Sequence, residues 1–392
     1  MNPFFSIVIP TRNRPYYLRQ AIQSALWQNF DDVEVLVSDN FNGSETQDVI
    51  REFSSQKKFR SVRTSSELNM PAHWEWATKQ ATGKYVLVLP DRKLLCQGAL
   101  KTIFRTIKKL DEHFNVYSFG TRMYDEDKKK MGYTVEKKKN RIFSSAEMID
   151  NFLHRNLYLP ESYDFFFPKT LNSCYKSEFA ATVRSGFGTY FNHHAVFTPD
   201  YSSMMVNLAL SEDCYYIAEY VMLTQGEKIS NGRLFSQGDY SSYLATLGLV
   251  DPFDLLPLKI PTTYNLIAND FLRIRNRVGG HLAGKVLDLQ NYFVTNYTDI
   301  LYKKRLQVNK ETVSDFEDHF WKSLHDMPED LQQQVNAAIN LLTKNSSRNH
   351  ITVDNFNLHA QDFIYARFSN VPALLKLLKI TFPDALHAAG FH

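Results

Sequence analysis

Alternation between buried-strand and helix patterns in the N-terminal part of the chain constrains the fold more than any other feature. Continuous apolar runs, typical of strands buried on both faces, occupy residues 4–10, 33–39 and 85–89. After the first run, apolar residues recur at helical spacing from Pro15 onward, and proline suits the first turn of a helix. This alternation predicts an α/β fold with a mostly parallel sheet covered by helices.

The length of the chain, 392 residues, is too great for one small core and predicts two parts. From about residue 260 onward the patterns are helical, for example at Phe316, Phe320 and Leu324. We therefore predict an α/β domain over residues 1–259 and a helical C-terminal region over residues 260–392. These C-terminal helices could also join copies of the chain into a homo-oligomer.

The net charge, the cysteine content and the absence of long apolar runs indicate which partners and which cellular compartment to expect. The net charge of +3 is small for this length and does not indicate a nucleic-acid partner. Three widely spaced cysteines form neither a disulfide framework nor a metal cluster, which fits a reducing compartment. No apolar run of about 18 residues could span a bilayer, and the N-terminus lacks the pattern of a secretory signal. These features predict a cytoplasmic protein, and they leave peripheral contact with the inner face of the membrane open.

Polar and charged residues follow three of the predicted strands. They are PTRNR at residues 10–14, SDNFNGSE at residues 38–45 and PDRK at residues 90–93. Because ligands of open parallel sheets bind beyond the carboxyl ends of the strands, these segments predict the ligand site. The first strand is not followed by GxGxxG, and the chain contains no GxxxxGK[ST]. Neither a Rossmann dinucleotide site nor a P-loop is therefore expected.

The segments FSIVIPTRNRPYYLRQAIQSALWQNFDDVEVLVSDNFNGSETQDVI and ATGKYVLVLPDRKLLCQGAL resemble the nucleotide-sugar-dependent glycosyltransferases of family 2, which have the GT-A fold. The resemblance covers roughly residues 4–240 and is strongest near the N-terminus. It implies a glycosyltransferase that moves a sugar from a nucleotide-diphosphate donor to a hydroxyl group of a glycan or lipid-linked acceptor.

The resemblance assigns the nucleoside and phosphates of the donor to the turns after the first two strands. The matching positions are Pro10, Thr11, Arg12, Arg14, Asp39 and Asn40. A carboxylate such as that of Asp39 can accept from a base N–H or a ribose hydroxyl, and arginines suit phosphate. The alternative for Asp39 is a turn-forming acid that stabilises the next helix.

Two further positions match donor-site positions of the family. Asn69 lies where relatives often have a residue near the base or donor, and a plain helix N-cap is an equally supported alternative. Lys228 lies where many relatives have a basic residue on a loop over the diphosphate, and a solvated surface lysine is the alternative.

The PDRK segment departs from the family pattern. Family members usually carry Asp-x-Asp here, and its carboxylates hold a divalent ion on the donor diphosphate, whereas this chain has Asp91, Arg92 and Lys93. A leaving diphosphate needs positive charge, which fixed Arg and Lys side chains can also supply. We therefore predict a catalytic Arg92, with Asp91 and Lys93 in the donor site and no requirement for Mn²⁺ or Mg²⁺. The alternatives are an Arg92–Asp91 ion pair, a solvent-facing Lys93 and a loss of donor binding.

An inverting transferase also requires a carboxylate to take the proton of the acceptor hydroxyl. Asp213, in SEDCYY, is a tempting match to the acid of the family motif. However, the family order of helix, short turn and strand places Asp200 in the base position, at a helix N-terminus that keeps a carboxylate ionised. Asp200 is the predicted base and Asp213 the second choice. A structural N-cap is the alternative for Asp200.

Two other functions fit part of the sequence. A sugar nucleotidyltransferase has a similar sheet, but it usually opens with a glycine-rich loop, and PTRNRP contains no glycine. A non-catalytic nucleotide- or glycan-binding protein with the GT-A fold is motivated by the missing acids of the metal motif. The sequence favours the transferase over both.

Overall fold

The structure is a computed structural model. It describes residues 2–126, 129–131, 139–154, 166–225, 253–305 and 310–348, together with Leu244. The strands are β1 (Phe5–Thr11), β2 (Val33–Asp39), β3 (Phe59–Arg63), β4 (Tyr85–Val88), β5 (Lys93–Leu95), β6 (Val116–Asp125), β7 (Lys130–Met131), β8 (Arg141–Ser144), β9 (Ser173–Lys176) and β10 (Asp213–Thr224). The helices are α1 (Pro15–Leu26), α2 (Ser44–Glu52), α3 (Met70–Lys79), α4 (Ala99–Lys109), α5 (Ser145–His154), α6 (Ser177–Phe187), α7 (Pro199–Leu210), α10 (Thr263–Val278), α11 (Leu289–Arg305), α12 (Lys310–His325) and α13 (Glu329–Arg348), with short 3-10 turns η1 (Thr170–Asn172) and η3 (Gly280–Leu282).

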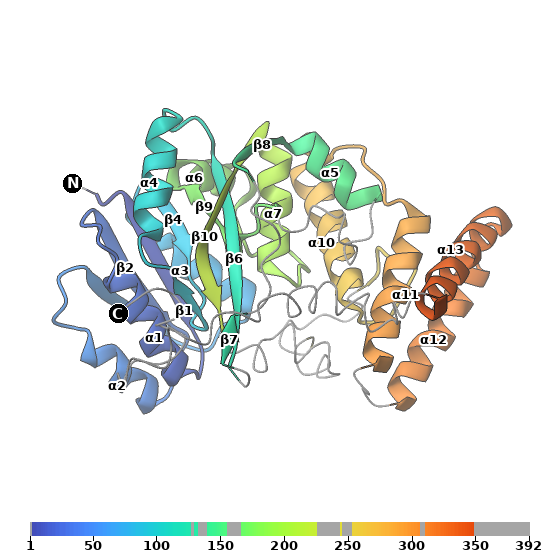
Figure 1. The fold of residues 1–392 in the computed structure, drawn as a ribbon, viewed down its shortest axis with the longest axis horizontal. Helices are drawn as coiled ribbons and strands as arrows, with labels where there is room; N and C mark the ends of the chain where they lie inside the picture. The colour runs from blue at the N-terminus through green and yellow to red at the C-terminus, as the bar shows by residue number, and fades with distance from the viewer. Residues whose placement is uncertain are drawn as a thin grey trace.

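The main path of the sheet has the strand order β3-β2-β1-β4-β9-β6-β10-β5. β1 pairs in parallel with β2 and β4, β2 with β3, and β6 with β10. β9 is antiparallel to both β4 and β6, so β6 and β10 run in the same direction as β1. The carboxyl ends of these parallel strands therefore lie at one edge of the sheet, the lower edge in Figure 1. The predicted α/β fold with a mostly parallel, helix-covered sheet is confirmed.

Helices cover both faces of the sheet. Every residue of β1 and of β2 is buried, as the continuous apolar runs predict for strands covered on two sides. One apolar cluster joins the sheet to α1, α2 and α4. A second cluster joins the opposite face to α3, α6 and α7. The polar ends of the strands are thus presented at the edge of a well-packed core.

The C-terminal helices continue the second cluster. α10 packs against α7, and α11, α12 and α13 extend away from the sheet (Figure 1). Phe316, Phe320 and Leu324 on α12 are buried, as their helical spacing predicts. The division of the chain at residues 259 and 260 stays a prediction, and α10 shares its core with the helix that carries Asp200.

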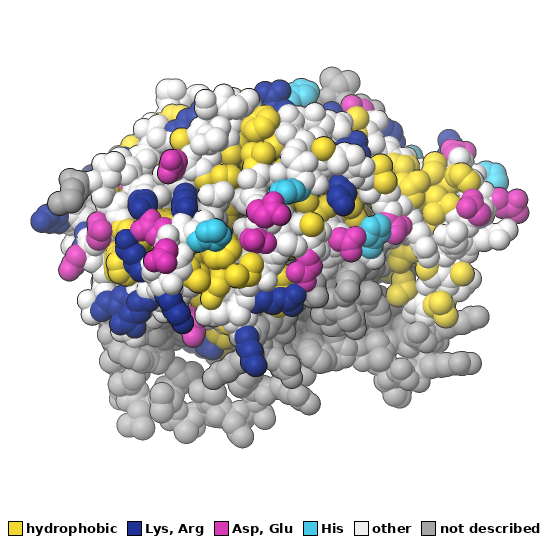
Figure 2. Space-filling view, turned by 90° about the horizontal axis from the view of Figure 1, so that it is seen from above, with side chains coloured by type: hydrophobic (Ala, Val, Ile, Leu, Met, Phe, Trp, Pro, Cys, Tyr) yellow, Lys and Arg dark blue, Asp and Glu magenta, His cyan; other side chains and the backbone are white. Residues whose placement is uncertain are grey.

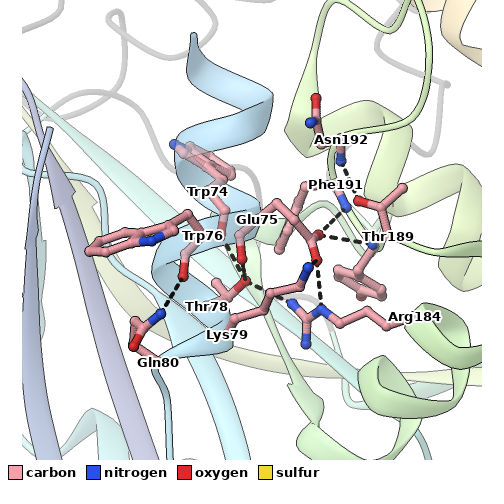
Figure 3. Close-up of polar contacts among 11 residues, drawn as sticks. Trp74, Glu75, Trp76, Thr78, Lys79, Gln80, Arg184, Thr189, Phe191 and Asn192 are labelled. Atoms are coloured by element: carbon pink, nitrogen blue, oxygen red, sulfur yellow. Dashed lines mark hydrogen bonds and ion pairs between the residues drawn. The ribbon is translucent and has the colours of Figure 1, made fainter. Parts of the chain in front are cut away.

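A buried carboxylate on α3 fixes the segment that follows α6 (Figure 3). Glu75 accepts hydrogen bonds from the backbone amides of Tyr190 and Phe191, each at 2.9 Å, and from Nε of Arg184 at 2.8 Å. Burial acts to raise the pKa of the Glu75 carboxyl, but the Arg184 guanidinium and the two amides outweigh it and lower the pKa to about 2. The start of the segment between α6 and α7 is therefore held firmly to α3.

The molecular surface carries charges of both signs. Figure 2 shows the molecule from above, which is the side opposite the carboxyl ends of the parallel strands. On this face, acidic and basic side chains are mixed with one another. Among the residues that the structure describes, no helix is long and apolar enough to cross a membrane.

Candidate active site

Asp91 joins the turn after β4 to the turn after β1. Its Oδ2 accepts a hydrogen bond from the Thr11 hydroxyl at 3.0 Å, and its Oδ1 forms an ion pair with Nη1 of Arg14 at 3.2 Å. The Asp91 residue is only 2% exposed. Thr11 and Arg14, two of the predicted donor residues, are therefore brought together with Asp91 at the carboxyl edge of the sheet. Pro10 lies within β1 and is buried.

The two cations that follow Asp91 differ in their surroundings. Arg92 donates from Nη1 to the Gln225 carbonyl at 3.4 Å, while the Gln225 amide donates to the Arg92 carbonyl at 3.0 Å. Lys93 begins β5, which pairs with the end of β10. Its residue is 5% exposed, and its Nζ donates to the Leu171 carbonyl at 2.9 Å. The alternative in which Lys93 merely faces solvent is wrong, because β10 and the 3-10 turn η1 cover it.

Asp39 ends β2 and is buried among four donors. The amide and Nδ2 of Asn42 donate to its Oδ1 at 2.8 and 2.6 Å. Its Oδ2 contacts Nε2 of Gln47 and lies 3.2 Å from Nη1 of Arg63. Because Gln47 belongs to α2, the carboxylate does tie the turn to the next helix, as the structural alternative proposes. A contact between Asp39 and the nucleoside stays a prediction.

Other predicted donor residues shape the loop before α3. Oδ1 of Asn40 accepts from the Leu68 backbone amide at 2.9 Å, and Nδ2 of Asn40 donates to the Leu68 carbonyl at 2.8 Å. Asn69 is the N-cap of α3 and accepts from the Ala72 amide at 3.0 Å. Arg12 is exposed and pairs with Glu67. The N-cap alternative for Asn69 is therefore present, and its role near the donor stays a prediction. Lys228 lies outside the described residues.

Asp200 lies in the first turn of α7, as predicted. One turn later on α7, the Ser203 hydroxyl lies 2.6 Å from the Thr170 hydroxyl in η1. Because Leu171 of η1 binds Lys93, this helix end lies beside the turn that follows β4. Burial raises the pKa of the Asp200 carboxyl above its ordinary value. The positive charge of Lys169, the amides at the start of α7 and, more weakly, the charge of Lys93 act to lower this pKa, but burial outweighs them.

Asp213 lies at the other edge of the sheet. It is the first residue of β10 and pairs with Ser144 of β8. Since β10 is parallel to β6, its first residue belongs to the edge where the parallel strands begin. The structure therefore separates Asp213 from Thr11, Asp39 and Lys93 by the length of the strands.

The structure adds two cations that the sequence did not single out. Arg63 ends β3, pairs with Asp39, and lies over the exposed Phe41 ring at 5.1 Å. Arg63 could have been predicted from the sequence, because polar residues at the carboxyl ends of parallel strands line the ligand site. Nζ of Lys169 lies 5.0 Å from the centre of the Tyr201 ring, and its positive charge acts to lower the pKa of the Asp200 carboxyl. No local pattern identifies Lys169, because its place depends on how η1 packs against α7.

Comparisons with known proteins agree with this fold. The family model described as "Glycosyl transferase family 2" matches residues 6–174, less than half of the chain. A Campylobacter jejuni protein named GalNAc(5)-diNAcBac-PP-undecaprenol beta-1,3-glucosyltransferase is 29% identical over 129 residues, which are 32% of this chain and 40% of the relative. The matched region thus spans well under two thirds of that relative.

A solved structure is similar over most of its length. TarS 1–349 of S. aureus in complex with UDP-GlcNAc has a TM-score of 0.51 and 14% sequence identity, with 94% of each chain covered. At this identity the similarity speaks for the fold alone. With the family match, it leads to the conclusion that the chain carries a glycosyltransferase family 2 domain over residues 6–174, built on the GT-A fold.

Proposed function

We propose that this protein transfers a sugar from a nucleoside diphosphate donor to a hydroxyl group of a glycan or glycolipid acceptor, with inversion at the anomeric carbon. The observation that supports the proposal is that α7, with Asp200 in its first turn, contacts the 3-10 turn η1. The Leu171 carbonyl of η1 accepts from Lys93, at the sheet edge where the predicted donor residues lie. The comparisons support both substrate classes. The S. aureus structure contains UDP-GlcNAc, and the C. jejuni relative is named for a PP-undecaprenol compound.

In the proposed reaction, the Asp200 carboxylate accepts the proton of the acceptor hydroxyl while the hydroxyl oxygen forms a bond to the anomeric carbon. The bond from that carbon to the diphosphate oxygen breaks, and its electron pair leaves with the nucleoside diphosphate. Arg92 and Lys93 stabilise the negative charge that grows on the diphosphate. A cytoplasmic location at the inner face of the membrane, and homo-oligomers through the C-terminal helices, stay predictions.

The residues at the PDRK segment do not fit a divalent metal ion. Asp91 already accepts from Thr11 and pairs with Arg14, and it stands beside two cations. Nearby positive charge raises the cost of binding another cation. In the part of the chain that the structure describes, no group of three or more His, Cys, Asp or Glu side chains is arranged to hold a metal ion. We therefore derive no step of the reaction through a metal.

Transfer should persist in excess EDTA. Purified protein would be incubated with a panel of nucleotide sugars and with lipid-linked and soluble glycan acceptors. Release of nucleoside diphosphate and formation of product would then be measured with EDTA or with Mn²⁺. Activity that vanishes with EDTA and returns with Mn²⁺ would contradict metal independence. Binding of nucleotide without transfer would favour the non-catalytic alternative, and release of pyrophosphate would favour a nucleotidyltransferase.

Asp39→Ala should weaken binding of the free nucleoside diphosphate by about 1.5–3 kcal/mol, because a charge-assisted hydrogen bond to the nucleoside is lost. Isothermal calorimetry on folded protein measures this directly. Gln47→Ala is the matched control, since it removes a structural partner of Asp39 but no proposed ligand contact. Equal losses of affinity in the two variants would assign Asp39 a structural role only.

A further inference from the structure

Two buried carboxylates hold the segment between α6 and α7, which precedes the helix that carries Asp200. Glu75 of α3 accepts from the backbone amides of Tyr190 and Phe191, near the start of the segment (Figure 3). Near the end of the segment, Asp270 of α10 accepts from the backbone amides of Phe197 at 2.8 Å and Thr198 at 2.7 Å. The second attachment lies immediately before α7. The position of the candidate base therefore depends on a helix from the C-terminal region.

Thr198 occupies the N-cap position of α7 but does not cap the helix. A threonine at this position ordinarily accepts a hydrogen bond from the amide of the second or third helical residue. Here its hydroxyl instead donates to Oδ2 of Asp270 at 2.5 Å. The amides that it would have capped belong to Asp200 and Tyr201, and both act to lower the pKa of the Asp200 carboxyl, against the effect of burial.

We propose that Asp270 is a positioning residue for Asp200: by binding the Thr198 hydroxyl and two adjacent amides, it fixes the start of α7, where the candidate base lies. The inference rests on the proposed function, in which the Asp200 carboxylate takes the proton of the acceptor. A base on a firmly held helix end keeps a constant distance and direction to the acceptor, which a reacting group requires.

The surroundings of Asp270 suit this role. The residue is fully buried, and Oδ1 also lies 3.3 Å from Nδ2 of Asn269, so its two oxygens face four donors. Burial raises the pKa of the Asp270 carboxyl to about 7, while the Thr198 hydroxyl and the bound amides lower it. Asparagine at this position would place an NH₂ group against donors, so it keeps the shape but cannot keep all four contacts.

The test compares Asp270→Asn with Glu75→Gln. Each change replaces a buried carboxylate that accepts from two consecutive amides of the same segment, so the two variants are matched in chemistry. We expect Asp270→Asn to lower kcat by roughly 100-fold, because small displacements of a reacting group cost about that much. The Kd of the nucleoside diphosphate should stay unchanged. Glu75→Gln should lower the Tm at least as much, while kcat of the folded protein stays close to wild type.

A milder pair of variants keeps the proposal testable if Asp270→Asn does not fold. Thr198→Val removes only the hydroxyl that donates to Asp270, and Thr198→Ser retains it. We expect the valine variant to lose part of kcat with an unchanged Kd for the donor nucleotide, and the serine variant to recover it. A purely structural role would lower Tm without this separation of kcat from Kd.

The possible outcomes separate this inference from the proposed function. If Asp200→Asn is inactive but Asp270→Asn and Thr198→Val keep the kcat of wild type, only the positioning role is overturned. An equal loss of kcat in Glu75→Gln would also overturn it, because the effect would then belong to the whole segment. If the wild type transfers no sugar, or if Asp200→Asn is as active as wild type, the proposed function fails and the inference fails with it.

Discussion

Asp200→Asn should abolish sugar transfer while leaving donor binding and folding nearly intact. The amide keeps the shape of the side chain but cannot accept the proton of the acceptor hydroxyl, and loss of a general base costs roughly 10²–10⁴-fold in rate. Steady-state kcat, the Kd of the nucleoside diphosphate and the Tm would be measured together. For the wild type, kcat should fall on acidification through the pKa of Asp200, which burial raises above that of an ordinary carboxyl.

Asp213→Asn is the matched control for this prediction. Asp213 begins β10, at the edge of the sheet where the parallel strands begin, whereas the predicted donor residues lie at the edge where these strands end. Replacement of Asp213 should therefore change kcat little. If Asp213→Asn were inactive and Asp200→Asn active, the assignment of the base would be reversed. The proton would then have to be taken at the edge where the parallel strands begin.

Arg92→Ala should lower turnover by more than it weakens donor binding. Negative charge grows on the diphosphate as the glycosidic bond breaks, so a fixed cation interacts more strongly with the transition state than with the bound donor. Loss of one such group typically costs about 10²–10³-fold in kcat. Arg92 lies on the turn between β4 and β5, where Nη1 of its guanidinium donates to the Gln225 carbonyl at 3.4 Å.

Single-turnover rates and the Kd of the donor nucleotide measure the two effects separately. Arg19→Ala is a suitable control, because Arg19 is half-exposed on α1 and pairs with Glu52 on the surface. It removes one positive charge without touching the proposed site. Equal losses in rate and in affinity for Arg92→Ala would mean that Arg92 binds donor and transition state alike, and would remove it from catalysis.

Local sequence patterns determined the N-terminal half of the fold. The run at residues 33–39 forms β2 with the predicted bounds, and α1 begins at Pro15 as expected. These features depend on neighbours in the sequence: continuous burial requires an unbroken apolar strand, and proline fixes the backbone of a first helical turn. The helix that begins at Pro199 with Asp200 in its first turn was instead expected from the order of helix, turn and strand in the family that the sequence resembles.

By itself, the sequence also determined which residues would gather at the ligand edge, because parallel strands must end together. Thr11, Asp39 and Asp91 lie there as predicted. What each side chain contacts at that edge was decided only by the tertiary structure. Asp91 pairs with Arg14, which lies far from it in the sequence, and Lys93 is buried by a strand that comes much later in the chain.

The tertiary structure alone also set the surroundings of the two candidate bases. Asp213 is excluded from the site by the direction of β10, which follows from its parallel pairing with β6. Asp200 is bordered by Lys169 and is held, through Thr198, by Asp270 of α10. No local pattern encodes these contacts, because each depends on the packing of segments that are distant in the sequence, and burial and charge at a site are properties of that packing.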